Sequence, residues 1–316
     1  MLDFDATDDR VHGSQEGRGF HGYYRHYCYL PLYVFAGQHL PCAYLPPSLI
    51  NPARHSRAVL KLLVTRLRGV WPDCEFVFQA DVGFCRWKTL RWCEKHDVRY
   101  VVGLARNQRI QKIAEPWMLD AARCFEHTQV KQRVIKQWFY QARSWDRMRK
   151  IVVKAEHLPT PGWDADDDDK DLGAANLRCV VTDLPNDRFP PDGISDRWYC
   201  GRGDMENRIK EQQLGLFADR TGCPSLAANR FRVLLSAAAY VLMQRLRETA
   251  LAGTDLASAQ CTTIRVKLLK LAARVSVSAR RVVLHLSSSW PRRALFAEVL
   301  AGLKKPTTMP AVLDSG

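Results

Sequence analysis

The sequence predicts a mixed α/β protein, with one sheet flanked by helices. In the first hundred residues, short apolar runs typical of strands alternate with segments that have the three- and four-residue spacing of amphipathic helices. The early runs follow one another across short turns, whereas the later ones are separated by helices, so antiparallel and parallel pairing should both occur. With 316 residues, 47% of them apolar and 25% charged, the chain can bury a large core.

The first predicted strand covers residues 2–4, and the polar, glycine-rich residues 5–22 follow it as a long loop or loose hairpin. Two aromatic and aliphatic runs come next, and Gly37 between them indicates an antiparallel pair. Amphipathic helices then alternate with buried strands. The predicted elements are strands 27–35 and 39–45, helix 58–70, strand 75–80, helix 88–96 and strand 99–104.

From Val134 the pattern changes to three strand-like segments with alternating basic residues. They cover residues 134–145, 147–158 and 176–184. We interpret them as an inserted β-strand subdomain. An acidic run, DADDDDKD at 164–171, separates the last two segments; it could bind a metal, but a run of carboxylates is more typical of a solvated loop.

The chain then becomes helical from Tyr199 to about Phe217, and a longer helix is predicted over residues 226–249. Apolar residues at 231, 234, 235, 238, 241, 242 and 246 form a broad stripe on it that should face the core. Short basic strands at 265–271 and 282–287, a helix at 292–303 and a flexible tail at 304–316 complete the chain. The expected organisation is therefore a first core segment (1–110), the inserted subdomain (111–195), a second core segment (196–303) and the tail.

The composition favours a polyanionic partner. Lys and Arg number 47 against 33 Asp and Glu, a formal charge of +14, which indicates nucleic acid first and an anionic membrane second, although a basic housekeeping enzyme would also fit. No run of about 18 apolar residues predicts a membrane span, since the longest candidate, 233–243, is flanked by Arg232 and Gln244. The acidic N-terminus is unlike a signal peptide.

Ten cysteines are present, and none forms a C-x-x-C pair. Their irregular spacing is typical neither of a zinc site nor of a disulfide scaffold. We therefore expect reduced thiols in a cytoplasmic protein.

Three acidic residues are candidates for chemistry. Asp5 ends the first predicted strand, Asp81 ends the strand EFVFQA, and Glu206 shares a helical stripe with Arg202, Lys210 and Gln213. In open α/β sheets, sites gather at the carboxyl ends of strands. Three converging carboxylates repel one another, and a divalent cation relieves that repulsion. Oxygen ligands without His or Cys favour Mg²⁺ or Mn²⁺, and two such ions can activate a water or hydroxyl toward a phosphodiester.

Each of these signals also has a structural interpretation. An Asp at a strand end often caps a turn, and a Glu on a helix usually faces solvent. The pattern Y-x-x-R-x-x-x-E, formed by Tyr199, Arg202 and Glu206, strengthens the functional interpretation because it places an aromatic and a cation on the turns before the acid.

Five segments together resemble a known family. LDFDATDD, HGYYRHYCYLPLYVF, QADVGFCR, YVVGLARN and WYCGRGDMENRIKEQQL are similar to the DDE transposases of bacterial insertion sequences (transposase DDE domain group 1), over residues 2 to about 296. The resemblance implies a ribonuclease H-like core with a β-strand insertion between the second Asp and the Glu. It also implies that Asp5, Asp81 and Glu206 are the catalytic, metal-binding triad for two Mg²⁺ or Mn²⁺ ions; Asp3 is a rival for the first place, but only Asp5 is followed by x-Thr.

The same resemblance implies DNA contacts. Tyr199 and Arg202 would touch the phosphates of the transposon end, with Arg208 and Lys210 as further DNA-binding residues. The family signature ends in a Lys where this chain has Gln213, and Lys210 is one turn earlier. Trp138 and Trp145 lie in the inserted segment, where a family aromatic can stack on a flipped base; a tryptophan in a strand is more often part of the core.

Family members generally carry a helical DNA-binding region before the core, and we expect this chain to lack it because its first catalytic strand starts at Leu2. The predicted function is cleavage of double-stranded DNA at insertion-sequence ends and transfer of the freed 3′-hydroxyl into target DNA, by a homodimer in the bacterial cytoplasm associated with the nucleoid. Two alternatives stay open: an inactive DNA-binding transposase remnant, and a ribonuclease H-like nuclease without strand transfer.

Overall fold

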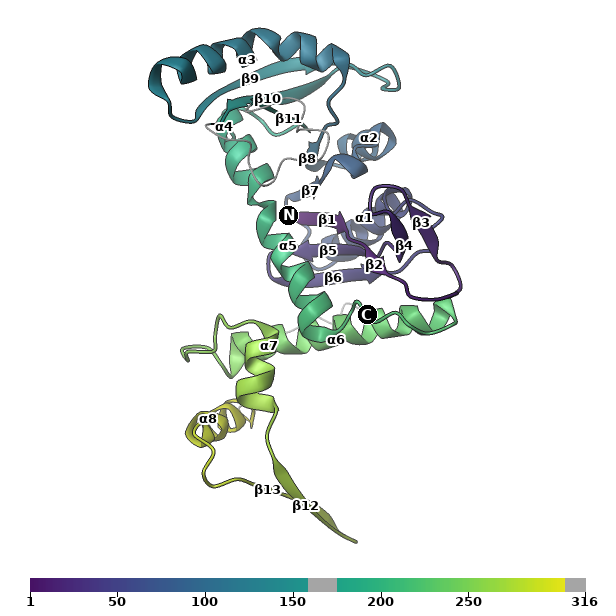
Figure 1. Ribbon diagram of the computed structural model, residues 1–316, viewed down its shortest axis with the longest axis vertical. Coiled ribbons are helices and arrows are strands. Elements are labelled where there is room, and N and C mark those ends of the chain that lie inside the picture. Colours follow the sequence, from purple (N-terminus) through teal and green to yellow (C-terminus); the bar gives the residue numbers. More distant parts are fainter. Residues whose placement is uncertain (159–174, 305–316) are drawn as a thin grey trace.

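The computed structural model describes residues 1–158 and 175–304 (Figure 1). The acidic run at 164–171 and residues 305–316 of the predicted tail lie outside the described residues. All ten cysteines lie inside them, and all are free thiols.

An eight-stranded mixed sheet with the order β6-β5-β1-β7-β8-β11-β10-β9 forms the centre of the molecule, which confirms the predicted fold class. β1 lies in its interior and pairs in parallel with β7, which in turn pairs in parallel with β8, while the remaining pairs are antiparallel. The strands are β1 (Leu2–Ala6), β5 (Leu32–Ala36), β6 (His39–Tyr44), β7 (Phe76–Ala80), β8 (Val98–Gly103), β9 (Gln132–Tyr140), β10 (Arg149–His157) and β11 (Ala175–Thr182).

One face of this sheet packs against three helices: α1 (Ala53–Arg68), α2 (Trp87–Lys95) and α3 (Gln108–Thr128). Period-two alternation points Phe4, Val34 and Phe78 to this face, and there they meet Leu60 of α1 and Leu90 of α2 in the largest core cluster. α1 and α2 match the predicted helices within a few residues, whereas α3 was not predicted.

The opposite face is crossed by one long helical segment, residues 191–215, which we call the crossing helix (Figure 1). It includes α4 (Pro191–Gly193) and α5 (Gly203–Lys210). Met205 and Ile209 of α5 pack on Tyr33 and Phe35 of β5. The helix was predicted to begin near Tyr199, but it begins eight residues earlier, at a proline that suits a first helical turn.

Residues 27–35 form two strands rather than the single predicted one. β4 (His26–Tyr29) ends before Leu30 and Pro31, and β5 starts at Leu32; Pro31 has no backbone N–H to donate to a ladder. β4 joins a separate small sheet with β2 (Asp9–Arg10) and β3 (Gly19–His21), inside the region predicted as a loose hairpin.

The three predicted strands after Val134 are confirmed as β9, β10 and β11. They do not form a sheet of their own: β11 pairs with β8, with Val181 opposite Val102, so the inserted strands extend the central sheet. The boundaries drawn for the core and inserted segments stay predictions.

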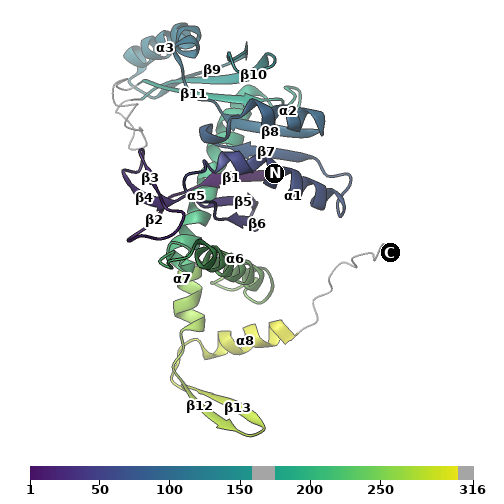
Figure 2. The same cartoon turned by 90° about the vertical axis from the view of Figure 1, so that its right-hand side faces the viewer.

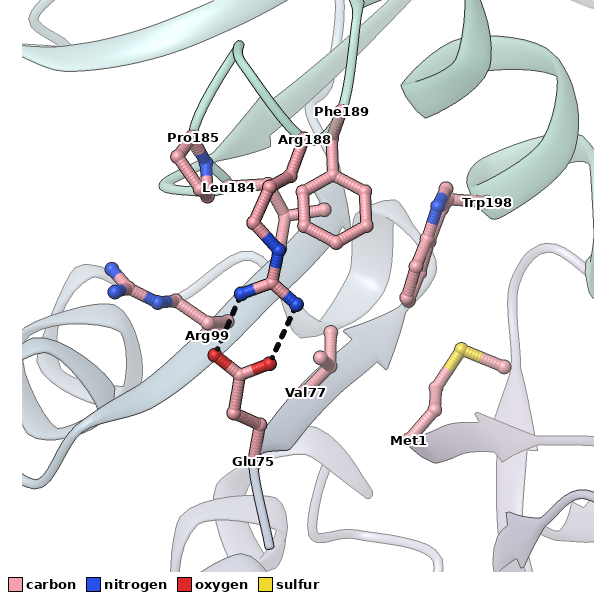
Figure 3. Close-up of a pocket in the computed structure, with 9 residues that line it drawn as sticks. All are labelled: Met1, Glu75, Val77, Arg99, Leu184, Pro185, Arg188, Phe189 and Trp198. Carbon is pink, nitrogen blue, oxygen red and sulfur yellow. Dashed lines mark hydrogen bonds and ion pairs between the residues drawn. The ribbon is translucent and has the colours of Figure 1, made fainter.

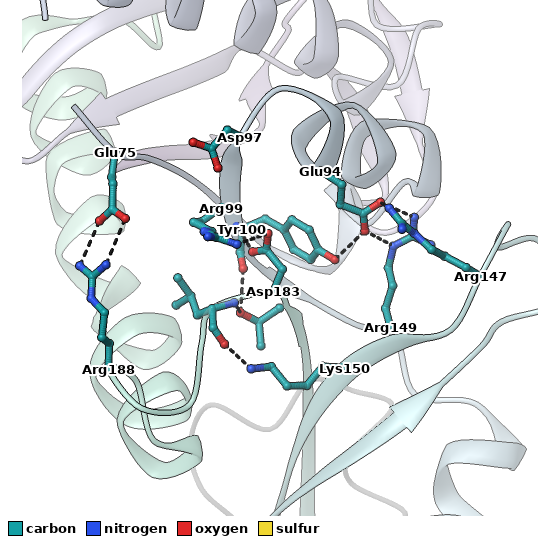
Figure 4. A network of polar contacts seen from close by, with 12 residues as sticks. Glu75, Glu94, Asp97, Arg99, Tyr100, Arg147, Arg149, Lys150, Asp183 and Arg188 are labelled. Atoms are coloured by element: carbon teal, nitrogen blue, oxygen red, sulfur yellow. Dashed lines mark hydrogen bonds and ion pairs between the residues drawn. The ribbon is translucent and has the colours of Figure 1, made fainter. Parts of the chain in front are cut away.

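A buried ion-pair network ties β10 to α2 (Figure 4). The Arg149 side chain is only 2% exposed, and its Nε donates to Oε1 of Glu94 over 2.8 Å. Tyr100 of β8 donates its hydroxyl to the same carboxylate, at 3.0 Å. Trp145, buried nearby, is part of the core as its position in a strand-rich segment suggested, whereas Trp138 is half exposed and meets Trp117 edge-on.

α6 (Leu226–Thr249) has the predicted bounds but not the predicted orientation. Val233 and Tyr240 are buried against residues of the strands, and Met243 is buried against the C-terminal part of the chain. The apolar stripe predicted to face the core is instead largely exposed; its exposed members are Phe231, Leu234, Leu235, Ala238, Val241 and Leu242. α6 is long and apolar enough to span a membrane, although core helices of soluble proteins meet the same criterion. The sequence had predicted no membrane span.

The C-terminal part extends away from the sheet (Figure 2). Residues 265–269 are helical and continue α7 (Cys261–Ile264), so the strand predicted at 265–271 is wrong. Cys261, Ile264 and Leu268 recur at helical spacing and are buried against α6, which explains the helix. A hairpin of β12 (Ala273–Ser278) and β13 (Arg281–Leu286) and the helix α8 (Arg293–Lys304) follow, the last two elements as predicted.

Candidate active site

Asp3 and Asp5 lie on one face of β1, because residues two apart along a strand share a face. Their antiparallel partners on β5 are Phe35 and Tyr33, the residues on which the crossing helix packs. The strand runs to Ala6, so Asp5 is inside it rather than at its end as predicted. Both carboxylates therefore lie beneath the crossing helix.

Asp81 lies beside Asp5 because β1 and β7 are parallel and Phe4 is in register with Ala80. Asp81 comes directly after β7, and its Oδ1 accepts a hydrogen bond of 2.9 Å from the Gly83 backbone N–H, which fixes the turn. The pKa of Asp5 is raised to about 7, because burial and the nearby Asp81 carboxylate raise it by more than Arg202 lowers it. The predicted pairing of these two aspartates at one edge of the sheet is present in the structure.

Arg202 of the crossing helix neutralises the aspartates of β1. Its Nε lies 3.0 Å from Oδ1 of Asp3, and its Nη2 lies 3.4 Å from Oδ2 of Asp5 and donates over 3.2 Å to the carbonyl of Phe4. The Arg202 side chain is only 11% exposed. Burial also raises the pKa of Asp3, again opposed by Arg202. Of the two aspartates, Asp5 is the more exposed and the nearer to Asp81, which favours it as a ligand.

Glu206 follows Arg202 by one turn on α5 and is exposed. Gln213, further along the same stripe, donates from Nε2 to the carbonyl of Asp8 over 2.9 Å. Glu206 thus lies on the helix between two residues that hold the chain segment from Asp3 to Asp8. Gln213, which replaces the lysine of the family signature, is a structural contact here.

The three predicted ligands are not gathered into one cluster. Within residues 1–158 and 175–304, no group of three or more His, Cys, Asp or Glu side chains is close enough to hold a metal ion. Asp5 and Asp81 are brought together, but the positive charge beside Asp5 is supplied by Arg202. By donor chemistry the site suits a divalent cation, since all three candidate ligands are hard carboxylate oxygens and the two aspartates repel each other.

Tyr199 and Arg202 point into the protein. A side-chain carbon on Gly103 of β8 would collide with the Tyr199 hydroxyl and would lie 2.8 Å from the backbone nitrogen of Val82, so glycine is required where the crossing helix meets the sheet. Lys210 is exposed, and the Arg208 side chain is 17% exposed. The predicted DNA contacts of these four residues stay predictions.

Sequence reasoning missed the pairing of Asp3 with Arg202 and the role of Gly103. Asp3 carried a signal, since a second acid two residues from Asp5 must share its face of the strand. Gly103 carried none, because its role depends on a tyrosine almost a hundred residues later.

A pocket of about 320 Å³ lies at the other end of the parallel strands (Figure 3). Trp198, Phe189 and Val77 line it, and the Arg188 guanidinium bridges to Glu75 with two bonds of 3.0–3.1 Å. Glu75 directly precedes β7 and Asp81 directly follows it, so this pocket is separate from the aspartate pair.

Comparison with known proteins agrees with the family suggested by the motifs. The family model for transposase DDE domain group 1 matches residues 1–308, so the chain belongs to this family. No curated protein matches the chain. Among solved structures, the piggyBac transposase in a synaptic complex with hairpin DNA is similar, with 8% identity and a TM-score of 0.43. The alignment covers 76% of this chain and 45% of the piggyBac chain, so the match spans less than half of that protein.

Proposed function

We propose that this chain is the catalytic domain of a DDE transposase, which cleaves phosphodiester bonds at insertion-sequence ends and joins the freed 3′-hydroxyl to target DNA. The observation that carries the proposal is the neighbouring pair of Asp5, in β1, and Asp81, directly after the adjacent parallel strand β7. The pair lies beneath a helix that carries Glu206, in a chain whose family is shown. The family generally uses divalent metal ions.

Asp5, Asp81 and Glu206 would hold the metal, which we propose to be two Mg²⁺ or Mn²⁺ ions. When bound, such ions supply an activated nucleophile and stabilise charge on the departing oxygen. The protein positions the ligands: β1 and β7 fix the two aspartates through their register, and the Gly83 N–H orients the Asp81 carboxylate. Arg202 stabilises the negative charge of Asp3 and Asp5 through direct ion pairs.

Double-stranded DNA is the proposed partner. The charge of +14 favours a polyanion, and Lys210 lies exposed one turn beyond Glu206, where a phosphate near the carboxylates would pass. Arg208, Tyr199 and Arg202 are the further proposed contacts. We also propose that the DNA-bound form is a homodimer, since two ends must be brought together.

A cleavage assay tests the proposal. Purified protein is incubated with an end-containing oligonucleotide duplex and Mg²⁺, and cleavage and strand-transfer products are resolved on gels. Asp81→Ala and Asp81→Asn should abolish both products, and the Asn variant keeps an oxygen that can accept from Gly83. Asp192→Ala, at an exposed position of the crossing helix, is the matched control and should retain activity.

Unchanged cleavage by a folded Asp81 variant would refute the assignment. Cleavage without joined products would indicate a nuclease. Salt-sensitive binding without cleavage by the wild type would indicate a DNA-binding remnant.

A further inference from the structure

Within residues 1–158 and 175–304, two apolar surfaces are left uncovered, and they lie on different elements. The first is the stripe of α6, where Phe231 is 61% exposed and Leu242 is 71% exposed. The stripe has the width and spacing of a helix face made for burial. The opposite side of α6 already packs on the sheet domain through Val233 and Tyr240. One helix therefore presents two apolar faces, and the described residues of a single chain cover one of them.

The second surface is one face of the β12–β13 hairpin. Cross-strand partners share a face, and on this face every pair is apolar: Ala273 with Leu286, Val275 with Leu284, and Val277 with Val282. The other face is mainly polar or basic: Arg274 lies opposite His285 and Ser278 opposite Arg281, and only the third pair, Ser276 with Val283, includes an apolar residue. Every residue of both strands is exposed. A two-stranded hairpin is marginally stable by itself in water, so a surface that covers its apolar face would stabilise it.

The two surfaces match in kind and in size. A six-residue strand is about 20 Å long, and the α6 stripe from Phe231 to Leu242 spans about 17 Å. Within one chain they do not meet, because the hairpin projects from the end of the molecule away from α6 in both views (Figures 1 and 2).

We propose that a second copy of this chain covers both surfaces: the hairpin of each copy packs its apolar face on the α6 stripe of the other. A two-fold axis makes the contact reciprocal, so one pairing covers all four surfaces. The basic face of each hairpin, with Arg274 and Arg281, then stays outward and available to a polyanion. A phosphate backbone does not fit the apolar faces themselves, because it is bound by cations and hydrogen-bond donors.

The contact between α6 and the hairpin would be the interface of the homodimer in the proposed function, and in that respect the inference rests on the proposed function. Its test uses neither DNA nor metal, so a chain that fails to cleave DNA can still form the dimer, and an active chain can fail to form it. The measurement is the molar mass of the full chain by size-exclusion chromatography with light scattering over a range of concentrations. We expect the wild type to reach twice the chain mass of 36.1 kDa.

Charge-pair variants make the test specific. Leu234→Glu/Leu242→Glu places acids on the α6 stripe, and Val275→Lys/Leu284→Lys places bases on the apolar hairpin face. Each variant alone should be monomeric. Their mixture should recover a dimer, because one contact is then wild type on both sides and the other brings Lys against Glu. Ser276→Lys/Val283→Lys, on the opposite hairpin face, is the matched control and should dimerise normally.

Circular dichroism establishes that each variant is folded, and the recovery in the mixture is itself evidence that both are. A wild type that stays monomeric, a dimer insensitive to both variants, or a mixture that stays monomeric would overturn the proposal. Flotation of a monomeric wild type with anionic phosphatidylserine vesicles, lost in Leu234→Glu/Leu242→Glu, would also overturn it and would assign the α6 stripe to a lipid surface.

Discussion

Arg202 forms an ion pair with Asp3, with its Nε 3.0 Å from Oδ1, across almost two hundred residues of sequence. The same guanidinium reaches Asp5 and the carbonyl of Phe4. The crossing helix is thereby fixed over the strand that carries the first candidate ligand. Because the side chains of Asp3 and Arg202 are 7% and 11% exposed, each needs the other as a partner.

Removing the Arg202 guanidinium should therefore destabilise the fold. In Arg202→Ala two buried carboxylates lose their partner, and we expect the free energy of unfolding to fall by about 3 kcal/mol or more. Urea denaturation monitored by tryptophan fluorescence measures it. Arg197→Ala, at an exposed position of the same helix, should change the free energy of unfolding by less than about 0.5 kcal/mol. Equal losses in the two variants would show that the buried ion pairs of Arg202 do not stabilise the fold.

Gly103→Ala should disturb the contact between the crossing helix and β8. The new carbon would meet the Tyr199 hydroxyl and the Val82 backbone, and overpacking of this kind costs about 1–3 kcal/mol. Gly201→Ala is the control, since nothing lies within 4 Å of its added carbon. Thermal unfolding of both variants compares them. Adding Tyr199→Phe to Gly103→Ala should restore part of the loss, and no restoration would mean that the hydroxyl is not the obstacle.

Asp9 should make stability depend on pH. It is buried, its Oδ2 accepts a hydrogen bond of 2.6 Å from Thr221, and burial raises its pKa from 3.8 to about 7. Between these values the folded state binds more protons than the unfolded state, so stability falls as pH rises, by at most about 1.4 kcal/mol per pH unit.

Asp9→Asn, which removes this titration, should make the fall in stability between pH 4 and pH 7 less steep, while Asp5, whose pKa is also raised to about 7, keeps its own contribution to the fall. Chemical denaturation at a series of pH values measures the slope. Asp192→Asn, at an exposed position, should keep the wild-type slope. If the Asp9→Asn slope also equalled that of the wild type, another group would have to be responsible.

The network around Glu94 contains one buried and one exposed arginine, so the effect of burial on the stability of an ion pair can be measured apart from the effect of charge. Arg149 and Arg147 both bind the Glu94 carboxylate, but their side chains are 2% and 55% exposed. We expect Arg149→Ala to lower the free energy of unfolding by about 3–5 kcal/mol and Arg147→Ala to lower it by less than about 1 kcal/mol. Denaturant titration of the two variants decides, and similar losses would contradict the assigned role of burial.

The sequence by itself determined most element types, since periodicity reports which side chains share a face. The strands that carry Asp5 and precede Asp81, the three strands after Val134 and the bounds of α6 were all predicted. Errors occurred where a short segment fits both the strand and the helix spacing of apolar residues. At residues 265–271 the segment is helical because that conformation buries Leu268. The family was also evident from local motifs, which need no tertiary information.

Only the tertiary structure decided which residues meet. The sequence predicted a DNA contact for Arg202, which stays a prediction, and gave no sign of the ion pairs that its side chain forms with Asp3 and Asp5. It turned the apolar stripe of α6 toward the core, whereas the other face is buried. In both cases one segment offers two possible partners, and the choice depends on contacts between residues far apart in the chain, which local periodicity does not contain.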